Sequence, residues 1–373
     1  MKTIRVFLMA LITIVCCSCS NQGKNDSTKG EFVAMRYSEL LQMKECDGYI
    51  YVQVRNPWDT TAILHSYILI ERDADVPASL PDGDIVRTPL KKTVMYTSVH
   101  SAMLMELGAY ECIKGVCDLK YINNKQIVKD CKAGKIANLG EGTSPSMEGI
   151  INLSPDAIML SPFQNSGSYS KMYKLGIPVI ECADYMETSA LGRAEWIRFY
   201  GLLVGHQKEA DSIFAEVEKS YKELKELAAT ATTHPSAITD LKFGSTWYVP
   251  GGNSTIGRLL RDAATNYIFK DTPDNGSIAL NPETVFERAM DADIWILRYN
   301  QASAKTYDEI AAEYSNYSNM KAFKQKNIYG CNTAQVPFYE ETPFHPDRLL
   351  KDFIKIFHPE LLPDYSTRYY HKL

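Results

Sequence analysis

The sequence has 373 residues, of which 45% are hydrophobic and 23% are charged. This length suits two domains with extensions, and the composition is that of a globular protein with a hydrophobic core. The net charge is −5 and no cluster of lysine and arginine is present, which argues against nucleic acid as a partner.

Residues 1–18 have the pattern of a secretory signal peptide. Lys2 and Arg5 precede an apolar run over residues 6–15 that is too short to cross a bilayer. The polar residues 19–47 that follow are expected to form a flexible tether. The sequence therefore predicts an exported protein.

The end of this signal resembles the signal of a bacterial lipoprotein. The resemblance implies lipidation of Cys19, with Cys16 and Cys17 as alternative positions. We therefore expect a periplasmic or cell-surface lipoprotein that is attached to the membrane only through the lipid on Cys19.

Six further cysteines match neither a zinc-binding spacing nor a redox pair: Cys46, Cys112, Cys117, Cys131, Cys182 and Cys331. Both buried thiols and a disulfide remain open for them, because the chain is predicted to be exported.

Residues 48–187 are expected to form an α/β lobe that begins with a β-hairpin. Residues 48–57 and 61–72 are the two hairpin strands. The strands after them are predicted at 93–97, 113–117, 156–161 and 178–183, and the helices at 98–109, 122–134, 146–154 and 167–176. Strands that alternate with helices indicate a parallel sheet covered on both faces.

A helical segment over residues 188–232 separates this lobe from the rest of the chain. Its long second helix is predicted to begin at Gln207 and end near Ala231. The apolar residues follow the spacing of one helix face: Ala210, Ile213, Phe214, Val217, Tyr221, Leu224 and Leu227. A helix of this length with one apolar face suits a rigid strut between two domains.

Residues 233–373 are expected to form a second α/β lobe with a C-terminal tail. Its strands are predicted at 241–247, 292–297 and 327–331. Its helices are predicted at 254–264, 282–290, 306–317 and 345–357. The fold class is therefore α/β, with two lobes joined by a long helix.

Catalytic signatures are missing from the sequence. We find no nucleophile elbow, metalloprotease motif, phosphate loop or dinucleotide fingerprint. The seven histidines lack metal-ligand spacing, although His100 and His345 are candidates to meet across a cleft. These patterns therefore give no reason to expect an enzyme or a metal site of the protein's own.

Ligands of parallel sheets bind at the carboxyl ends of the strands. Here aromatic residues and one cation follow nearly every predicted strand, which suits a bulky, flat or anionic small molecule. The residues predicted to bind the ligand are Tyr96, His100, Phe163, Trp247, Arg298, Tyr299, Phe338 and Tyr339. Among them, Trp247 and Phe163 are expected to contact the ligand from opposite lobes.

Three stretches, over residues 139–160, 192–225 and 345–373, resemble a known family. It comprises the solute-binding lipoproteins of ABC importers in the class with one rigid interdomain helix, which serve vitamin B12, heme and ferric siderophores. The resemblance implies two lobes joined by a strut, with the ligand in the cleft beside the strut. It further implies a monomer whose partners are a membrane permease and its ATPase.

The resemblance also implies a division of roles along the chain. One acid on each lobe, Glu148 and Glu283, would dock to arginines of the permease. The ligand would be a metal chelate, first a ferric siderophore and alternatively a corrinoid or heme, so that iron or cobalt arrives inside the ligand and no cofactor is resident. Tyr96 or His100 as an axial ligand would favour heme or a corrinoid. A bare metal ion and an enzyme on the same scaffold are the remaining alternatives.

Overall fold

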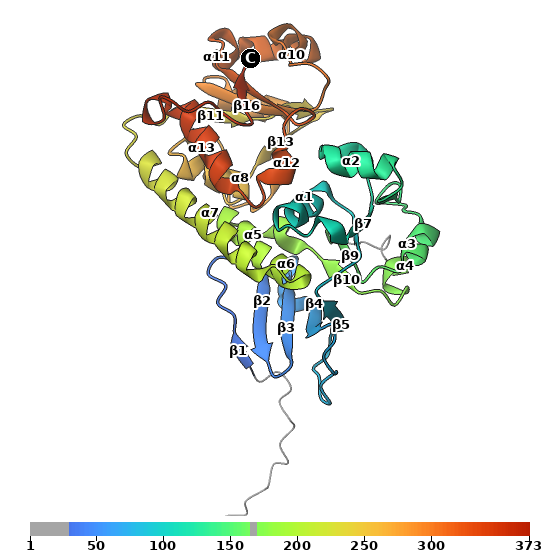
Figure 1. Ribbon diagram of the computed structural model, residues 1–373. Helices are drawn as coiled ribbons and strands as arrows, with labels where there is room; N and C mark the ends of the chain where they lie inside the picture. The colour runs from blue at the N-terminus through green and yellow to red at the C-terminus, as the bar shows by residue number, and fades with distance from the viewer. Residues whose placement is uncertain (1–29, 165–169) are drawn as a thin grey trace, which may run out of the picture.

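The computed structural model describes residues 30–164 and 170–373. Figure 1 shows three parts: an N-terminal sheet, a first α/β lobe beside it, and a second α/β lobe at the opposite end from the sheet. The predicted signal peptide, Cys19 and residues 167–169 of one predicted helix lie outside the described residues. The predicted organisation into two α/β lobes joined by a long helix is confirmed.

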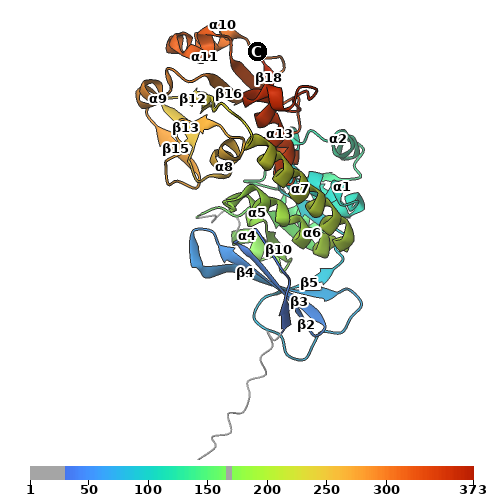
Figure 2. The ribbon, with the colours of Figure 1, turned by 90° about the vertical axis from the view of Figure 1, so that its left-hand side faces the viewer.

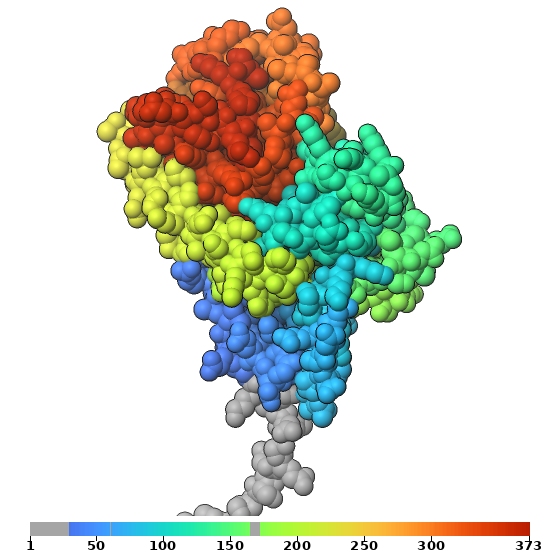
Figure 3. Space-filling model, viewed as in Figure 1, coloured from blue at the N-terminus to red at the C-terminus, as the bar shows by residue number. Residues whose placement is uncertain are grey.

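The N-terminal sheet is larger than the predicted hairpin. It has five strands in the order β1-β2-β3-β4-β5. They are β1 (Gly30–Phe32), β2 (Leu41–Cys46), β3 (Tyr49–Asn56), β4 (Asp59–Glu71) and β5 (Asp84–Thr88). The prediction of a tether up to residue 47 is therefore wrong, because β1 and β2 lie within it. Figure 3 shows this sheet as a separate blue layer below the two lobes.

The first lobe is built on a parallel sheet in the order β10-β9-β6-β7-β8. Its strands are β6 (Thr93–Met95), β7 (Ile113–Val116), β8 (Ala137–Asn138), β9 (Ala157–Leu160) and β10 (Val179–Glu181). The helices between them are α1 (Ser98–Glu106), α2 (Lys125–Lys132), α3 (Met147–Leu153) and α4 (Ser170–Tyr173). The central strands β6 and β9 are fully buried, as their continuous apolar sequences predict.

Three helices connect the lobes: α5 (Ala190–Glu195), α6 (Ile197–Val204) and α7 (Gln207–Ala228). Helix α7 is the predicted strut, and its 22 residues span about 33 Å. It buries Ala210, Phe214, Val217, Tyr221 and Leu224, which are five of the residues predicted for its apolar face. Figures 1 and 2 show that it runs from α6 to the C-terminal helix α13 (Pro346–Phe357) of the second lobe.

A strap formed by residues 36–40, between β1 and β2, ties the N-terminal sheet to these connecting helices. The backbone N–H groups of residues 36–38 donate to the carboxylate of Glu195 at 2.8–2.9 Å. Those of residues 39 and 40 donate to Glu187 at 3.0 and 3.1 Å. Both carboxylates are buried, and buried charge without such donors is costly. The strap therefore fixes the sheet against the junction of the lobes.

The second lobe contains two sheets. The larger has the order β14-β11-β16-β17-β18, in which only β18 is antiparallel. Its strands are β11 (Ser236–Thr239), β14 (Asn266–Tyr267), β16 (Ile294–Tyr299), β17 (Ile328–Asn332) and β18 (His371–Lys372). The smaller is antiparallel and consists of β12 (Lys242–Phe243), β13 (Thr246–Pro250) and β15 (Ser277–Leu280).

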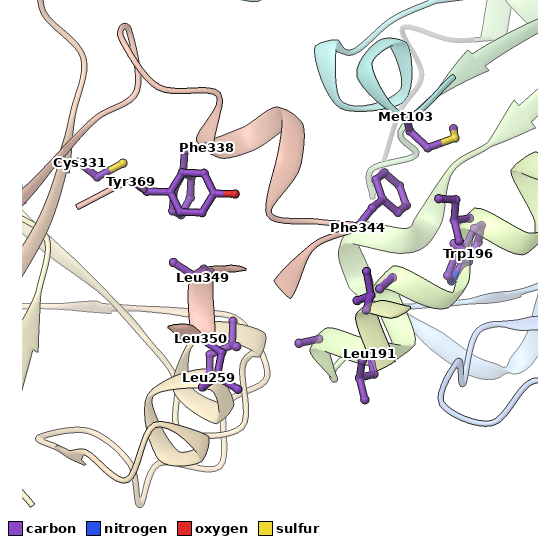
Figure 4. Close-up of a cluster of buried hydrophobic side chains, with 14 of the residues drawn as sticks. Met103, Leu191, Trp196, Leu259, Cys331, Phe338, Phe344, Leu349, Leu350 and Tyr369 are labelled. Atoms are coloured by element: carbon purple, nitrogen blue, oxygen red, sulfur yellow. The ribbon is translucent and has the colours of Figure 1, made fainter. Parts of the chain in front are cut away.

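The helices of the second lobe are α8 (Thr255–Asp262), α9 (Pro282–Ala289), α10 (Tyr307–Glu313), α11 (Lys321–Lys324), α12 (Phe338–Glu341) and α13. The segment between α12 and α13 reaches across to the first lobe. Figure 4 shows Phe344 of this segment close to Met103 of α1, and its ring centroid lies 5.9 Å from that of Tyr200. His345 bonds Glu106 at 2.6 Å from the same segment. The lobes are thus joined beside the strut as well as through it.

The six cysteines of the described part are all free, and four of them are buried. The structure therefore has free thiols at these positions rather than a disulfide.

Candidate functional site

A cavity of about 260 Å³ lies between the two lobes. The first lobe and the connecting helices contribute Val99, Tyr185, Ala190 and Arg193 to its wall. The second lobe contributes residues from β13, α8, β15, β16 and the segment from α12 to α13. Figure 4 shows two of its lining residues, Phe338 and Leu349, on the side of the second lobe.

Arg298 is the cation that the second lobe places at the cavity. Its guanidinium donates to both carboxylate oxygens of Asp240, at 3.0 and 2.8 Å, and its side chain remains 29% exposed. The charge of Asp240 raises the pKa of Arg298 further above its usual range. The guanidinium is therefore held in a fixed orientation by its partner, and that pair carries no net charge.

Arg193 is the matching cation on the side of the first lobe, and it is also paired with a buried carboxylate. It donates to Asp184 at 3.0 Å, but Asp184 also bonds His100 at 2.9 Å. Although burial disfavours a charged imidazole, Cys182 and Asp184 raise the pKa of His100 to about 10. Asp184 therefore holds the Arg193 guanidinium and the His100 imidazole together behind this wall.

The first turns of three helices border the same cavity. Val99 belongs to α1, Thr255 and Ile256 to α8, and Pro346 to α13. Helix N-termini carry partial positive charge and favour anions. Among the described residues, the cavity wall contains two arginines and no carboxylate, histidine or thiol. The wall therefore combines two guanidinium groups, each paired with a carboxylate behind it, with the first turns of three helices.

Two of the predicted ligand-binding residues lie in the core of the first lobe instead. His100 is 1% exposed, and its ring nitrogens bond Thr97 at 2.6 Å and Asp184 at 2.9 Å. Tyr96 is 4% exposed and donates to the sulfur of Met172 at 3.4 Å. Neither side chain lines the cavity, because Tyr96 after β6 and His100 on α1 are both buried in the packed interior.

The expected position of Trp247 is also wrong. Its side chain is fully buried, donates to the carbonyl of Thr239 at 3.1 Å and packs against Phe286, Trp295 and Tyr317. The sequence placed it at the end of a parallel strand, whereas it is the second residue of the antiparallel strand β13. Side chains alternate along a strand, so it is the neighbouring Tyr248 that faces outward, with 48% exposure.

The other predicted residues lie closer to the cleft. Arg298, Phe338 and Tyr339 line the cavity, and Tyr299 lines an adjoining groove of about 540 Å³ together with Arg298 and Tyr339. Phe163 is 42% exposed in the loop after β9 and is not part of either wall. Their contacts with a ligand remain predictions.

Sequence reasoning missed several residues of the cavity wall, above all Arg193, Ser254 and Thr255. Arg193 lay in a predicted helix, where an arginine usually signals no more than a solvated face. Ser254 caps α8 by accepting a bond from the N–H of Gly257 at 3.1 Å. A serine at a predicted helix start was therefore the one available signal for that part of the wall.

The two acids predicted to dock to a permease are exposed on different lobes. Glu148 lies in the first turn of α3 and Glu283 in the first turn of α9. Within residues 30–164 and 170–373, neither carboxylate forms an ion pair. Their position is that of acids favoured by the helix dipole, and docking remains a prediction.

The described residues hold no group of three or more histidine, cysteine or acidic side chains arranged for a metal ion. His100 and His345, the predicted pair, do not meet: His100 bonds Asp184, and His345 bonds Glu106 of α1 across the lobes. In the same part of the chain, no helix is long and apolar enough to cross a membrane.

Two α/β lobes, a continuous helix between them and a charged cavity at their junction define a solute-binding protein of the rigid-helix class. The chain belongs to the periplasmic binding protein family, whose model matches residues 94–334. The N-terminal sheet lies outside the matched region.

Relatives and solved structures agree with this assignment. Two uncharacterized lipoproteins of Methanocaldococcus jannaschii are 28% and 27% identical, over 91% and 82% of this chain and 86% and 75% of theirs. An ABC-type Fe3+-hydroxamate transport protein of Saccharomonospora viridis has a TM-score of 0.55 at 18% identity, covering 72% of this chain and 94% of its own.

Two further structures with the same fold bind different solutes. The heme complex of S. aureus IsdE has a TM-score of 0.55 at 18% identity, covering 72% of this chain and 98% of its own. The molybdate-bound MolA of Haemophilus influenzae has a TM-score of 0.57 at 14% identity, covering 76% and 90%. The fold is therefore shared by carriers of unlike solutes.

It follows that the protein is the exported, non-enzymatic solute-binding component of an ABC importer, with lipoproteins among its relatives. It binds a small solute and works with an ABC permease.

Proposed function

We propose that the solute is an anionic metal chelate, with a ferric siderophore as the first candidate. The observation that carries this proposal is the composition of the cavity wall, which combines Arg193 and Arg298 with three helix N-termini and, within the described residues, no carboxylate. An anionic solute gains charge-assisted hydrogen bonds from both lobes in such a site.

The alternatives fit this wall less well. A bare metal ion requires several histidine, cysteine or carboxylate ligands, and the described wall has none. For heme or a corrinoid, the axial ligands predicted from the sequence were His100 and Tyr96, and both are buried and bonded within the first lobe. A chelate whose metal is already saturated by its own donors needs no ligand from the protein.

A compact oxyanion is the second candidate, and the observation that favours it is size. The cavity of about 260 Å³ is smaller than the 300–1,000 Å³ typical of drug-sized ligands. MolA, which binds molybdate, shares the fold. A chelate would have to extend from the cavity into the adjoining groove, whereas an oxyanion would fit within the cavity.

Replacing Arg193 with glutamine is expected to weaken binding of an anionic solute about 10- to 100-fold, because a hydrogen bond to a charged group is lost. Asp184 keeps His100 and Tyr200 as partners, so the fold should be retained. Isothermal titration with ferric citrate, a cationic ferric hydroxamate, hemin, cobalamin and molybdate measures the effect. The first of these should bind in preference to the second.

Arg258→Gln is the matched control. Arg258 lies on α8 of the second lobe and donates to the carbonyl of Asn253, but its side chain does not line the cavity. Equal affinities of Arg193→Gln and the unmodified protein for every anionic solute would contradict the proposal. Selective binding of molybdate would establish the second candidate.

We further propose that the lipid on Cys19 anchors the protein. Cys19→Ala should move the protein from the detergent phase to the aqueous phase in a phase-partitioning assay, because the lipid supplies most of the membrane affinity. Cys17→Ala serves as the control and should remain in the detergent phase. If instead Cys17→Ala alone becomes aqueous, the anchor is Cys17.

A further inference from the structure

The outer face of the small antiparallel sheet presents two aromatic rings. Phe243 pairs with Thr246 across β12 and β13, and Tyr248 lies two residues beyond Thr246 on the same face of β13. Their exposed fractions are 81% and 48%. Opposite Tyr248 on β15 is Ala279, whose small side chain leaves this face flat.

A third ring comes from another element of the same lobe. Tyr339 of α12 is 52% exposed and lines the groove of about 540 Å³ that also contains Phe243 and Tyr248. We call Phe243, Tyr248 and Tyr339 the aromatic face. Other exposed aromatic residues, such as Phe32 and Tyr121, belong to neither the groove nor the cavity.

The groove is continuous with the cavity between the lobes. Four residues line both of them: Pro250, Ser277, Arg298 and Tyr339. A ligand that is held at the two arginines and is too large for the cavity therefore extends along the aromatic face. Lys242 and Lys305 also line the groove, together with the carboxylates of Asp240 and Glu313, which pair with Arg298 and Lys305.

We propose that the aromatic face is a second subsite, which binds an aromatic arm of the ligand by stacking. The proposal rests on the proposed function and narrows it to anionic chelates that carry aryl groups, of the catecholate type. Flat, electron-rich rings suit this subsite because stacked and edge-to-face pairs of rings add affinity beyond the area that they bury. A compact ferric chelate without rings would use the cavity alone.

The test compares two anionic iron complexes that differ in aromatic character. Iron(III) with excess 2,3-dihydroxybenzoate and iron(III) with excess citrate are titrated by equilibrium dialysis against the unmodified protein and the double variant Phe243→Leu/Tyr248→Leu. Leucine keeps an apolar side chain and removes the ring. The double variant should lose about tenfold in affinity for the aromatic complex and retain its affinity for citrate.

Two further variants sharpen the comparison. Tyr248→Phe keeps the ring and should bind the aromatic complex as the unmodified protein does. Phe32→Leu removes an exposed ring from the N-terminal sheet, far from the groove, and should not change the affinity for either complex. Because all of these positions are exposed, thermal unfolding midpoints should be unaltered, which separates loss of binding from loss of fold.

The outcomes distinguish a failure of the aromatic subsite from a failure of the proposed function. If the aromatic complex binds and the double variant binds it equally well, the subsite is refuted while the proposed function stands. An equal loss for both complexes would mean that the face acts through charge or shape rather than through its rings, which also refutes it. If neither complex binds the unmodified protein, both the proposed function and the subsite are refuted.

Discussion

Changing Glu148 and Glu283 together to lysine is expected to abolish uptake while leaving solute affinity unaltered. Both acids are exposed and lie on different lobes, outside the cavity wall. If they dock to arginines of the permease, lysine would repel those arginines, and charge repulsion at an interface costs more than a lost contact. Uptake of the loaded solute into vesicles that contain the permease measures the first effect, and titration measures the second.

The matched control reverses one exposed acid from each lobe away from α3 and α9, namely Glu111 and Asp308. This pair should support normal uptake. The defect of a milder alanine pair at Glu148 and Glu283 should change with salt, because exposed charges are screened within about 10 Å at 0.1 M. Normal uptake by the lysine pair would contradict docking and would mean that the two acids only stabilise the first turns of their helices.

Replacing Glu195 with alanine is expected to lower the free energy of unfolding by about 3 kcal/mol or more. The carboxylate is fully buried and accepts the backbone N–H groups of residues 36–38. Its removal leaves several N–H groups without an acceptor, and each such group costs about 1–3 kcal/mol. Urea denaturation followed by circular dichroism gives the value.

Two controls accompany this variant. Glu195→Gln keeps one acceptor oxygen and should cost less than alanine. Glu216→Ala removes an exposed carboxylate from α7 and should change stability by less than about 0.5 kcal/mol. A cost for Glu195→Ala that matches Glu216→Ala would show that the strap does not hold the N-terminal sheet to the connecting helices.

The elements with strong periodicity were predicted well from the sequence. The strut followed from the spacing of its apolar face, and its observed end at Ala228 lies three residues before the predicted end. The parallel strands β9 and β16 followed from apolar runs that begin after an aspartate. In such elements local pattern and global burial agree, which is why pattern alone sufficed.

The N-terminal sheet was underestimated because its first strands are short or mixed in character. Strand β2 has the sequence LQMKEC, in which only Leu41 and Met43 are buried. The carboxylates that receive the strap, Glu187 and Glu195, come from a distant part of the chain. A prediction from local polarity alone therefore assigns this segment to a flexible tether.

The site was harder to predict than the fold, since it depends on which face each strand presents. Strand β11 was missed, so the second lobe was started one strand late and Trp247 was assigned to a strand end. Neighbouring residues of a strand face opposite sides of the sheet, so an error of one residue places a core side chain in the groove. Trp247, which is buried, and Tyr248, which lines the groove, show this. The burial of His100 could not be predicted from its neighbours in the sequence, because its partner Asp184 is 84 residues away.

The most direct test of the central claim is to identify the solute that is bound when the protein is purified from its host. Native mass spectrometry and a visible spectrum should show one iron-containing anionic chelate for each chain, without a Soret band. The same preparation of Arg193→Gln should carry little or none of it. A heme or corrin spectrum, or a metal ion without an organic chelator, would contradict the account.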